Sequence, residues 1–191
     1  MEEKKIKTSR RFRYVDNYRM TRRTREDGTV TEEAEYVGNY LLAEHPEQVY
    51  RSVRRLAAAS SVLSLLAAVL LLAVKGFAVY GGGLYALVPA AAALFPGIYL
   101  LLGAMKLPPD DRKLQEDVYR FGHARIRKSA HGVLFLYSAT LFLSLVFFVT
   151  SGVSPGALDI LYFILAVFPA AAGRILLWNM DKLKYHSSGQ A

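Results

Sequence analysis

Two charged residues stand at the edges of long uncharged stretches, where ionisable groups can pair or carry ions. Lys75 follows the uncharged stretch 56–74, and Asp159 follows the uncharged stretch 129–158. If these stretches are membrane helices, both residues lie on the same side of the membrane, on helices that are neighbours in a four-helix bundle. We predict an ion pair between Lys75 and Asp159 that closes the bundle; the alternative is a step in an ion or proton relay.

Arg174 is a further charged residue that could carry a function. It lies about 22 Å of helix beyond Asp159, which leaves it a turn or more inside the opposite membrane boundary. An arginine at that depth extends its side chain toward the lipid headgroups. The sharper alternative is that Arg174 binds an anionic lipid or substrate in a pocket.

Three prolines, Pro89, Pro96 and Pro169, lie inside apolar segments. Each removes a backbone donor and is therefore a candidate helix kink. Kinked helices line cavities in transporters, but prolines are also common in purely structural membrane helices. We favour the structural interpretation.

Motifs that would identify an enzyme or a metal site are absent from the sequence. The histidines are His45, His123, His131 and His186. They lack metal-ligand spacing, and the sequence has no cysteine, no phosphate-binding loop, no GxSxG elbow and no HExxH motif. Asp110 and Asp111, which follow two prolines, are interpreted as a helix cap. We therefore predict no catalytic residue, no metal and no cofactor, and enzyme activity is uncertain and unsupported.

The composition indicates which structural elements hold these residues. Of the 191 residues, 53% are hydrophobic, yet 24 Lys and Arg against 16 Asp and Glu give a net charge of +8. Charged and apolar residues are segregated, because the stretches 56–74, 76–105 and 129–158 contain no Asp, Glu, Lys or Arg. A helix of roughly 20 apolar residues spans the ~30 Å hydrocarbon core of a bilayer. The pattern predicts an integral membrane protein and excludes disordered, collagen-like, coiled-coil and disulfide-stapled classes.

The predicted fold class is an all-α integral membrane protein with four transmembrane helices. The expected spans are 56–77, 84–105, 131–151 and 157–180. The glycine-rich segment Tyr80–Gly83 and the segment Ser151–Gly156 are short enough to be tight turns, so the spans form two antiparallel hairpins.

The distribution of Lys and Arg predicts the orientation. Residues 1–55 hold 13 of them, residues 106–128 hold seven, and the two opposite loops hold only Lys75. Positive charge resists translocation, so both termini and the middle loop are expected in the cytoplasm. We predict a multi-pass protein of the cell membrane, with a prokaryotic inner membrane favoured, whose basic face contacts anionic lipid headgroups.

A β-hairpin is predicted in the leader, because Asp27–Gly28 separates two runs rich in Tyr, Val and Thr. A two-residue type I′ turn makes paired residue numbers sum to 55. That register places Arg22 opposite Glu33 and Arg23 opposite Glu32. It further pairs Thr24 with Thr31, Tyr18 with Val37 and Val15 with Tyr40. The opposite charges support the register and argue against nucleic-acid binding by the arginines.

The two hairpins of helices are also candidates for an internal duplication. Glu47-Gln-Val-Tyr-Arg51 precedes the first span, and Glu116-Asp-Val-Tyr-Arg120 precedes the third. Phe-Pro recurs at residues 95–96 and 168–169 in the second and fourth spans. A true repeat would relate the halves by an axis along the membrane normal; chance similarity of Ala- and Leu-rich helices is the alternative.

These features divide the chain into five parts: a leader with the hairpin at 1–45, helical hairpins at 46–105 and 131–180, a basic helical loop at 106–130 and a tail at 181–191. The leader and the basic loop together form a predicted cytoplasmic cap. Our leading hypothesis is a non-enzymatic scaffold or interaction subunit that binds a protein partner, or itself, through the leader hairpin. The alternatives are a small-solute or ion transporter or channel subunit and, third, a membrane-embedded enzyme.

Overall fold

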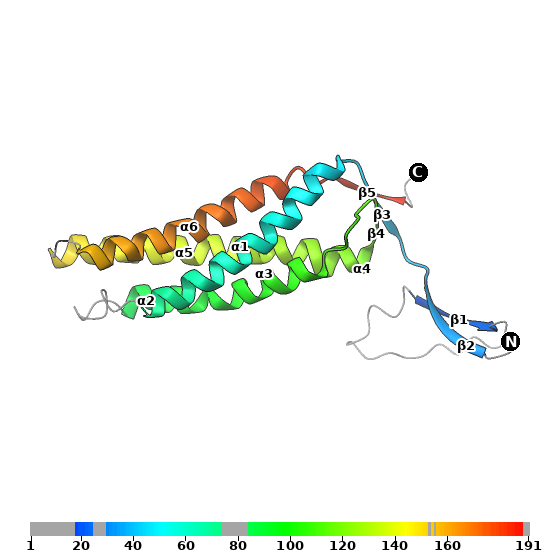
Figure 1. The fold of residues 1–191 in the computed structure, drawn as a ribbon, viewed down its shortest axis with the longest axis horizontal. Helices are drawn as coiled ribbons and strands as arrows, with labels where there is room; N and C mark the ends of the chain where they lie inside the picture. Colours follow the sequence, from blue (N-terminus) through cyan, green and yellow to red (C-terminus); the bar gives the residue numbers. More distant parts are fainter. Residues whose placement is uncertain (1–17, 25–29, 74–83, 153, 155, 189–191) are drawn as a thin grey trace.

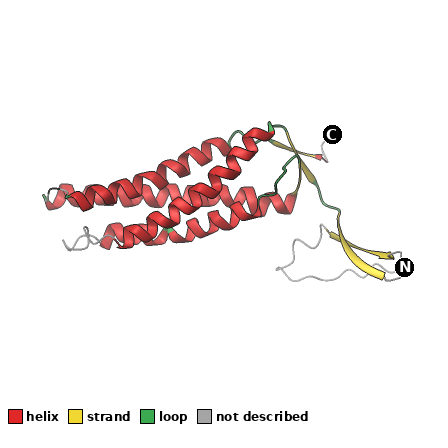
Figure 2. Ribbon diagram, viewed as in Figure 1, coloured by secondary structure: helices red, strands yellow, loops and turns green. Residues whose placement is uncertain are grey.

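A long helical bundle with a small sheet at one end makes up the computed structural model, which describes residues 18–24, 30–73, 84–152, 154 and 156–188 (Figures 1 and 2). The long helices are α1 (Glu47–Ala73), α2 and α3 (Leu84–Ala92 and Leu94–Lys106), α5 (Arg125–Ser151) and α6 (Ala157–Met180). They provide four helical segments that are long and apolar enough to cross a membrane. The prediction of four long apolar helices is thus confirmed.

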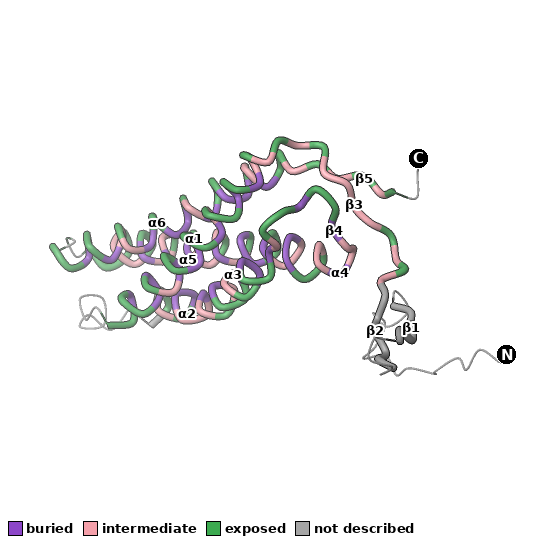
Figure 3. The backbone as a smooth tube through the Cα atoms, turned by 45° about the vertical axis from the view of Figure 1, so that its right-hand side comes forward, coloured by how far each residue is buried: buried purple, intermediate pink, exposed green. Residues whose placement is uncertain are grey.

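The bundle has a simple cyclic arrangement. Helix α1 packs against α3 and α6 and has fewer contacts with α2, whereas α5 packs against α2, α3 and α6. Buried residues line the inward faces of the helices, and exposed ones lie outside (Figure 3). The interior is filled by large side chains such as Tyr137 and Tyr162, which are fully buried, and by small residues such as Ala57 and Ala166. Small residues let the helix backbones approach closely, as they do in membrane bundles.

The second apolar segment is interrupted at Ala93, between α2 and α3. Pro96 lacks the N–H that would donate to the carbonyl of Ala92, four residues earlier, and its ring crowds that carbonyl. Of the three predicted kinks, only the one at Pro96 coincides with a break. The helical runs of α2 and α6 continue through Pro89 and Pro169.

The third apolar segment starts well before its uncharged part. Helix α4 (Glu116–Tyr119) continues through the π-helical turn η4 (Arg120–Ala124) into α5, which gives 36 residues of continuous helix. At 1.5 Å per residue this helix is about 54 Å long, far more than the ~30 Å of a hydrocarbon core. The first turns therefore belong to the end of the bundle that carries the sheet.

A three-stranded antiparallel sheet, which the sequence did not predict, caps this end (Figure 1). Its order is β4-β3-β5, with β3 (Tyr40–Ala43) in the centre, β4 (Lys113–Gln115) on one side and β5 (Tyr185–Ser187) on the other. We call it the cap sheet. Leu41 pairs with Leu114 and with Ser187, so the leader, the middle loop and the tail each contribute one strand.

The leader hairpin is present, but its predicted register is wrong by one residue. Strands β1 (Tyr18–Thr24) and β2 (Val30–Tyr36) pair with residue numbers that sum to 54, so that Arg22 lies opposite Glu32. When the numbers of paired residues add up to an even value, an odd number of residues separates the two strands. A type I′ turn has two residues and therefore does not fit this register.

The shifted register replaces the other predicted pairs as well. Arg23 pairs with Thr31, Thr24 with Val30 and Tyr18 with Tyr36. The turn residues Asp27 and Gly28, together with Val15, lie outside the described residues, as does the predicted turn at 80–83. Tyr40, which was expected opposite Val15 in the hairpin, instead pairs with Gln115 in the cap sheet.

Candidate functional site in the cap

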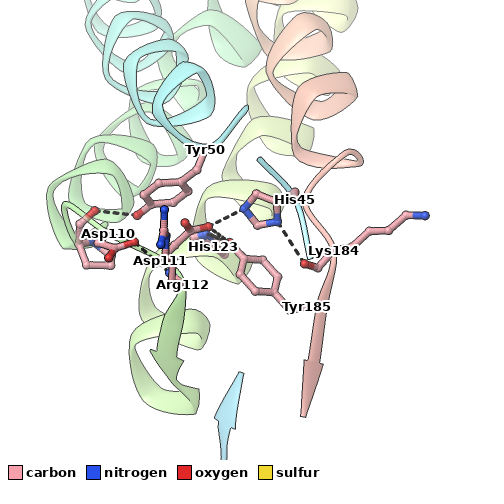
Figure 4. Close-up of polar contacts among 9 residues, drawn as sticks. His45, Tyr50, Asp110, Asp111, Arg112, His123, Lys184 and Tyr185 are labelled. Carbon is pink, nitrogen blue, oxygen red and sulfur yellow. Dashed lines mark hydrogen bonds and ion pairs between the residues drawn. The ribbon is translucent and has the colours of Figure 1, made fainter. Parts of the chain in front are cut away.

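Four polar side chains from distant parts of the chain meet beneath the cap sheet (Figure 4). His45 lies between β3 and α1, Asp111 between α3 and β4, His123 in η4 and Tyr185 in β5. Between 62 and 139 residues separate the chain segments that bond to one another here. We call these four residues the cap network.

Hydrogen bonds connect all four members. Asp111 is 1% exposed, and its Oδ2 lies 2.6 Å from His45 Nε2 and 2.9 Å from the Tyr185 hydroxyl. The same hydroxyl lies 2.8 Å from His123 Nε2. His45 Nδ1 lies 3.1 Å from the carbonyl oxygen of Lys184. One buried carboxylate therefore links α1, the middle loop, the π-helical turn and the tail.

The partners determine where the protons lie. Tyr185 has one hydroxyl proton and donates it to Asp111, so His123 must donate its Nε2 proton to the Tyr185 oxygen. His45 faces a carbonyl with one nitrogen and a carboxylate with the other, and both of these groups accept. Both nitrogens of the buried His45 ring therefore have a hydrogen-bond partner.

Two tyrosines hold the ring of His123. Tyr50 stacks on it at a centroid distance of 5.7 Å and an interplanar angle of 9°, and Tyr119 lies 5.4 Å away. The Tyr50 hydroxyl also donates to the carbonyl of Pro108 at 2.7 Å. These are the tyrosines of the two matching segments that begin with Glu47 and Glu116 and open α1 and α4.

Burial, followed by the hydrogen bond to Asp111, raises the pKa of the Tyr185 hydroxyl above its ordinary value. Tyr185 therefore remains a donor to Asp111 throughout the neutral range. His123 Nδ1 finds no hydrogen-bond partner among the described residues. A cavity of about 150 Å³ adjoins this ring and is also lined by Arg127 and Lys128.

The arrangement favours a structural role for the cap network. Within the described part of the chain, no group of three or more His, Asp or Glu side chains could hold a metal ion. The carboxylate is enclosed by its donors, and His45 and Asp111 have side chains that are only 3% and 2% exposed. Buried hydrogen bonds between distant segments favour one arrangement of the elements they join. Here the network fixes the cap sheet on the bundle.

Asp110 and Asp111 do not cap a helix, so that interpretation is wrong. The next helix begins at Glu116, after the strand β4. Asp110 Oδ1 accepts the Arg112 N–H at 3.1 Å, and Asp111 turns inward to the cap network. The strand pairing of Lys113 to Gln115 with β3 competes with helix formation there and wins, because it satisfies the backbone of both segments.

The residues that the sequence singled out lie elsewhere. Asp159 is buried in the first turn of α6, where its carboxylate accepts the Gly156 N–H at 2.9 Å. Lys75 lies outside the described residues, so the ion pair stays a prediction. Arg174 is exposed on the outer face of α6, next to exposed Ile175, and this position fits a side chain that extends toward headgroups.

Sequence reasoning missed all four members of the cap network. The histidines lack any local spacing that indicates a site, and their partners come from other segments. The only local signal is the repeated Glu-x-Val-Tyr-Arg segment, because both of its tyrosines contact His123.

The base of the leader hairpin is attached to the same region. The Tyr36 hydroxyl accepts the N–H of Glu116, the first residue of α4, at 3.1 Å and donates to the carbonyl of Asn39 at 2.9 Å. The rings of Tyr36 and Tyr40 contact each other edge to face at 5.1 Å. Tyr36 thus supplies the capping acceptor that the helix start itself does not provide.

Removing this hydroxyl by Tyr36→Phe is expected to loosen the start of α4 while leaving β1 and β2 paired. A lost N-cap acceptor costs about 1 kcal/mol, which corresponds to roughly fivefold faster exchange of the Glu116 amide hydrogen. Hydrogen exchange followed by mass spectrometry measures this effect. Tyr40→Phe is the matched control and should leave the exchange unchanged; equal acceleration in both variants would contradict the assigned role of Tyr36.

Comparisons of the chain with protein-family models, with curated proteins and with solved structures found no match.

Proposed function

We propose that the protein is a non-enzymatic membrane scaffold or interaction subunit, whose cytoplasmic cap binds a protein partner through the leader hairpin. One observation carries this proposal. In the described part of the chain, β1 and β2 form a sheet of two strands only, and each strand pairs with no strand but the other. Among the described residues, the outer edge of each strand therefore has no further strand beside it.

Two-stranded sheets are marginally stable in water and gain stability from a third strand. Addition of an extended segment from another chain satisfies the open backbone groups and is a common mode of peptide recognition. The hydrogen bond from Glu116 to Tyr36 ties the base of the hairpin to the helical bundle. A partner captured at the hairpin would thus be held at a defined place on the membrane surface.

Purification of the full chain from its native membranes in a mild detergent, with mass determination of the complex, tests the proposal. Ala34, opposite Met20 in the hairpin, is replaced by proline, which removes a backbone donor and is disfavoured inside a strand. We expect Ala34→Pro to lower the recovered partner at least about tenfold.

The matched control is Val37→Pro, because Val37 is exposed and follows the last residue of β2. This variant should retain the partner. A monomer without bound protein in the unaltered chain, or equal loss in both proline variants, would refute strand addition at the hairpin. A homo-oligomer that encloses a continuous cavity would instead favour the transporter alternative.

A further inference from the structure

A basic and aromatic groove lies between α3 and the start of α5. It has a volume of about 530 Å³. Its lining includes three basic side chains, two aromatic rings and a serine: Arg120, Arg125, Lys128, Tyr99, Phe121 and Ser129. Among the described residues, no acidic side chain lines it. We call it the α3–α5 groove.

Arg125 is held in place by the aromatic rings of the groove. Its guanidinium carbon lies 5.7 Å from the centroid of Tyr99 and 5.9 Å from that of Phe121. Contacts of this kind fix the orientation of the guanidinium while leaving its N–H donors available to an anion. Lys128 follows three residues later and lies on the same helical face, so the two cations flank one position.

The position of the groove along the bundle indicates which anion fits. Ser129 is the first residue of the uncharged stretch that continues to residue 158, so the groove lies where the charged and apolar parts of the helix meet. In a membrane this is the level of the phospholipid headgroups. The part of α3 that precedes Tyr99 exposes apolar side chains, including Phe95, which is 69% exposed, and Ile98, which is 47% exposed.

We propose that the α3–α5 groove is a binding site for an anionic phospholipid. The phosphodiester lies between Arg125 and Lys128, and one acyl chain lies along the exposed apolar face of α3. Charge complementarity selects an anionic headgroup over a zwitterionic one, because the lining supplies cations without acidic groups. The apolar face selects a lipid over a free phosphate, which has no chain to bury there.

Native mass spectrometry of the full chain in a neutral detergent tests this site. The probes are phosphatidylglycerol and phosphatidylcholine with identical acyl chains, and soluble glycerol phosphate as competitor. We expect preferential retention of one phosphatidylglycerol. The double variant Arg125→Gln and Lys128→Gln should lower that retention by about 10- to 30-fold, since each near-surface cation contributes a factor of about five.

The matched control removes the same charge at the same end of the bundle. Lys182 and Lys184 lie after α6, which does not pack against α3, and both are exposed. Their replacement by glutamine should change lipid retention less than twofold. Equal losses in both double variants would show general attraction to the basic surface and overturn the site. Displacement of the lipid by equimolar glycerol phosphate would show a phosphate site and would also overturn it.

A single variant keeps the test decisive if the double variant fails to fold. Lys128 is exposed, so Lys128→Gln leaves the packing intact and should lower phosphatidylglycerol retention about fivefold. Unchanged retention in this folded variant would overturn the proposal. The outcome is independent of the leader hairpin, because the groove and the hairpin share no residue.

Discussion

Replacing Asp111 with alanine is expected to lower the free energy of unfolding by about 3 to 5 kcal/mol, the largest effect of any single substitution that we predict. The carboxylate accepts from His45 and from Tyr185, and it is 1% exposed. Its removal leaves the buried ring of His45 and the buried hydroxyl of Tyr185 without this hydrogen-bond partner. Such groups cost more when orphaned than the original pair gained.

The cap sheet should respond first to this substitution. Asp111 in the middle loop is hydrogen-bonded to Tyr185 of β5 and to His45, which precedes α1. The substitution removes both hydrogen bonds. Hydrogen exchange of residues 40–43 and 185–187 should accelerate strongly, while the exchange of α5 and α6 changes little. Thermal unfolding in detergent measures the overall loss.

Asp110→Ala is the matched control for Asp111→Ala. Asp110 is the neighbouring carboxylate, it is exposed, and its described contact is the Arg112 N–H. Its removal should cost less than about 1 kcal/mol. Equal destabilisation by the two substitutions would mean that the cap network does not hold the sheet. The isosteric Asp111→Asn should lie between them, because it keeps the shape and loses the charge.

Gly103→Ala is the second large effect that we expect, a loss of about 1 to 3 kcal/mol. A Cβ atom at Gly103 would lie 2.8 Å from Ile126 Cγ1 and 3.4 Å from the Ile126 backbone nitrogen. Ile126 is fully buried, so it has no free space into which it can move. Helices α3 and α5 would have to separate at this contact. Thermal unfolding in detergent, compared with the unaltered chain, measures the loss.

The control for this prediction is the same substitution in another helix of the bundle. A Cβ atom at Gly173 in α6 would lie 3.4 Å from the carbonyl oxygen of Ala130, which is an ordinary contact. Alanine also gains about 1 kcal/mol of helix propensity over glycine. Gly173→Ala should therefore be neutral or stabilising. If Gly103→Ala were equally tolerated, the close packing of α3 on α5 would be disproved.

Local chemistry identified the prolines as candidate kinks, because proline cannot donate a backbone hydrogen bond. It did not show which of them interrupts a helix: the break lies near Pro96, whereas α2 and α6 continue through Pro89 and Pro169. The register of the leader hairpin was not predictable in this way. Its favourable charge pairs suited one register, and a shift of one residue preserves an Arg–Glu pair at Arg22, so side-chain pairing alone does not discriminate between the two.

Asp111 illustrates the limit most clearly. After two prolines a carboxylate is locally an ordinary helix cap, and nothing near it in the sequence indicates a buried site. Its partners His45 and Tyr185 are 66 and 74 residues away. Only the closure of the bundle and the pairing of β3 with β5 bring them together, because a buried carboxylate is stable only where donors converge on it.

The sequence by itself determined the four helices that are long and apolar enough to cross a membrane, because segregation of charge from apolar residues is a property of each segment alone. The tertiary structure decided the cap sheet, the cap network and the α3–α5 groove. Each of these needs strands or side chains from segments far apart in the chain, and their contacts form only when the helices pack. The groove follows the same rule, since Arg125 and Lys128 become a site only beside Tyr99 of a different helix.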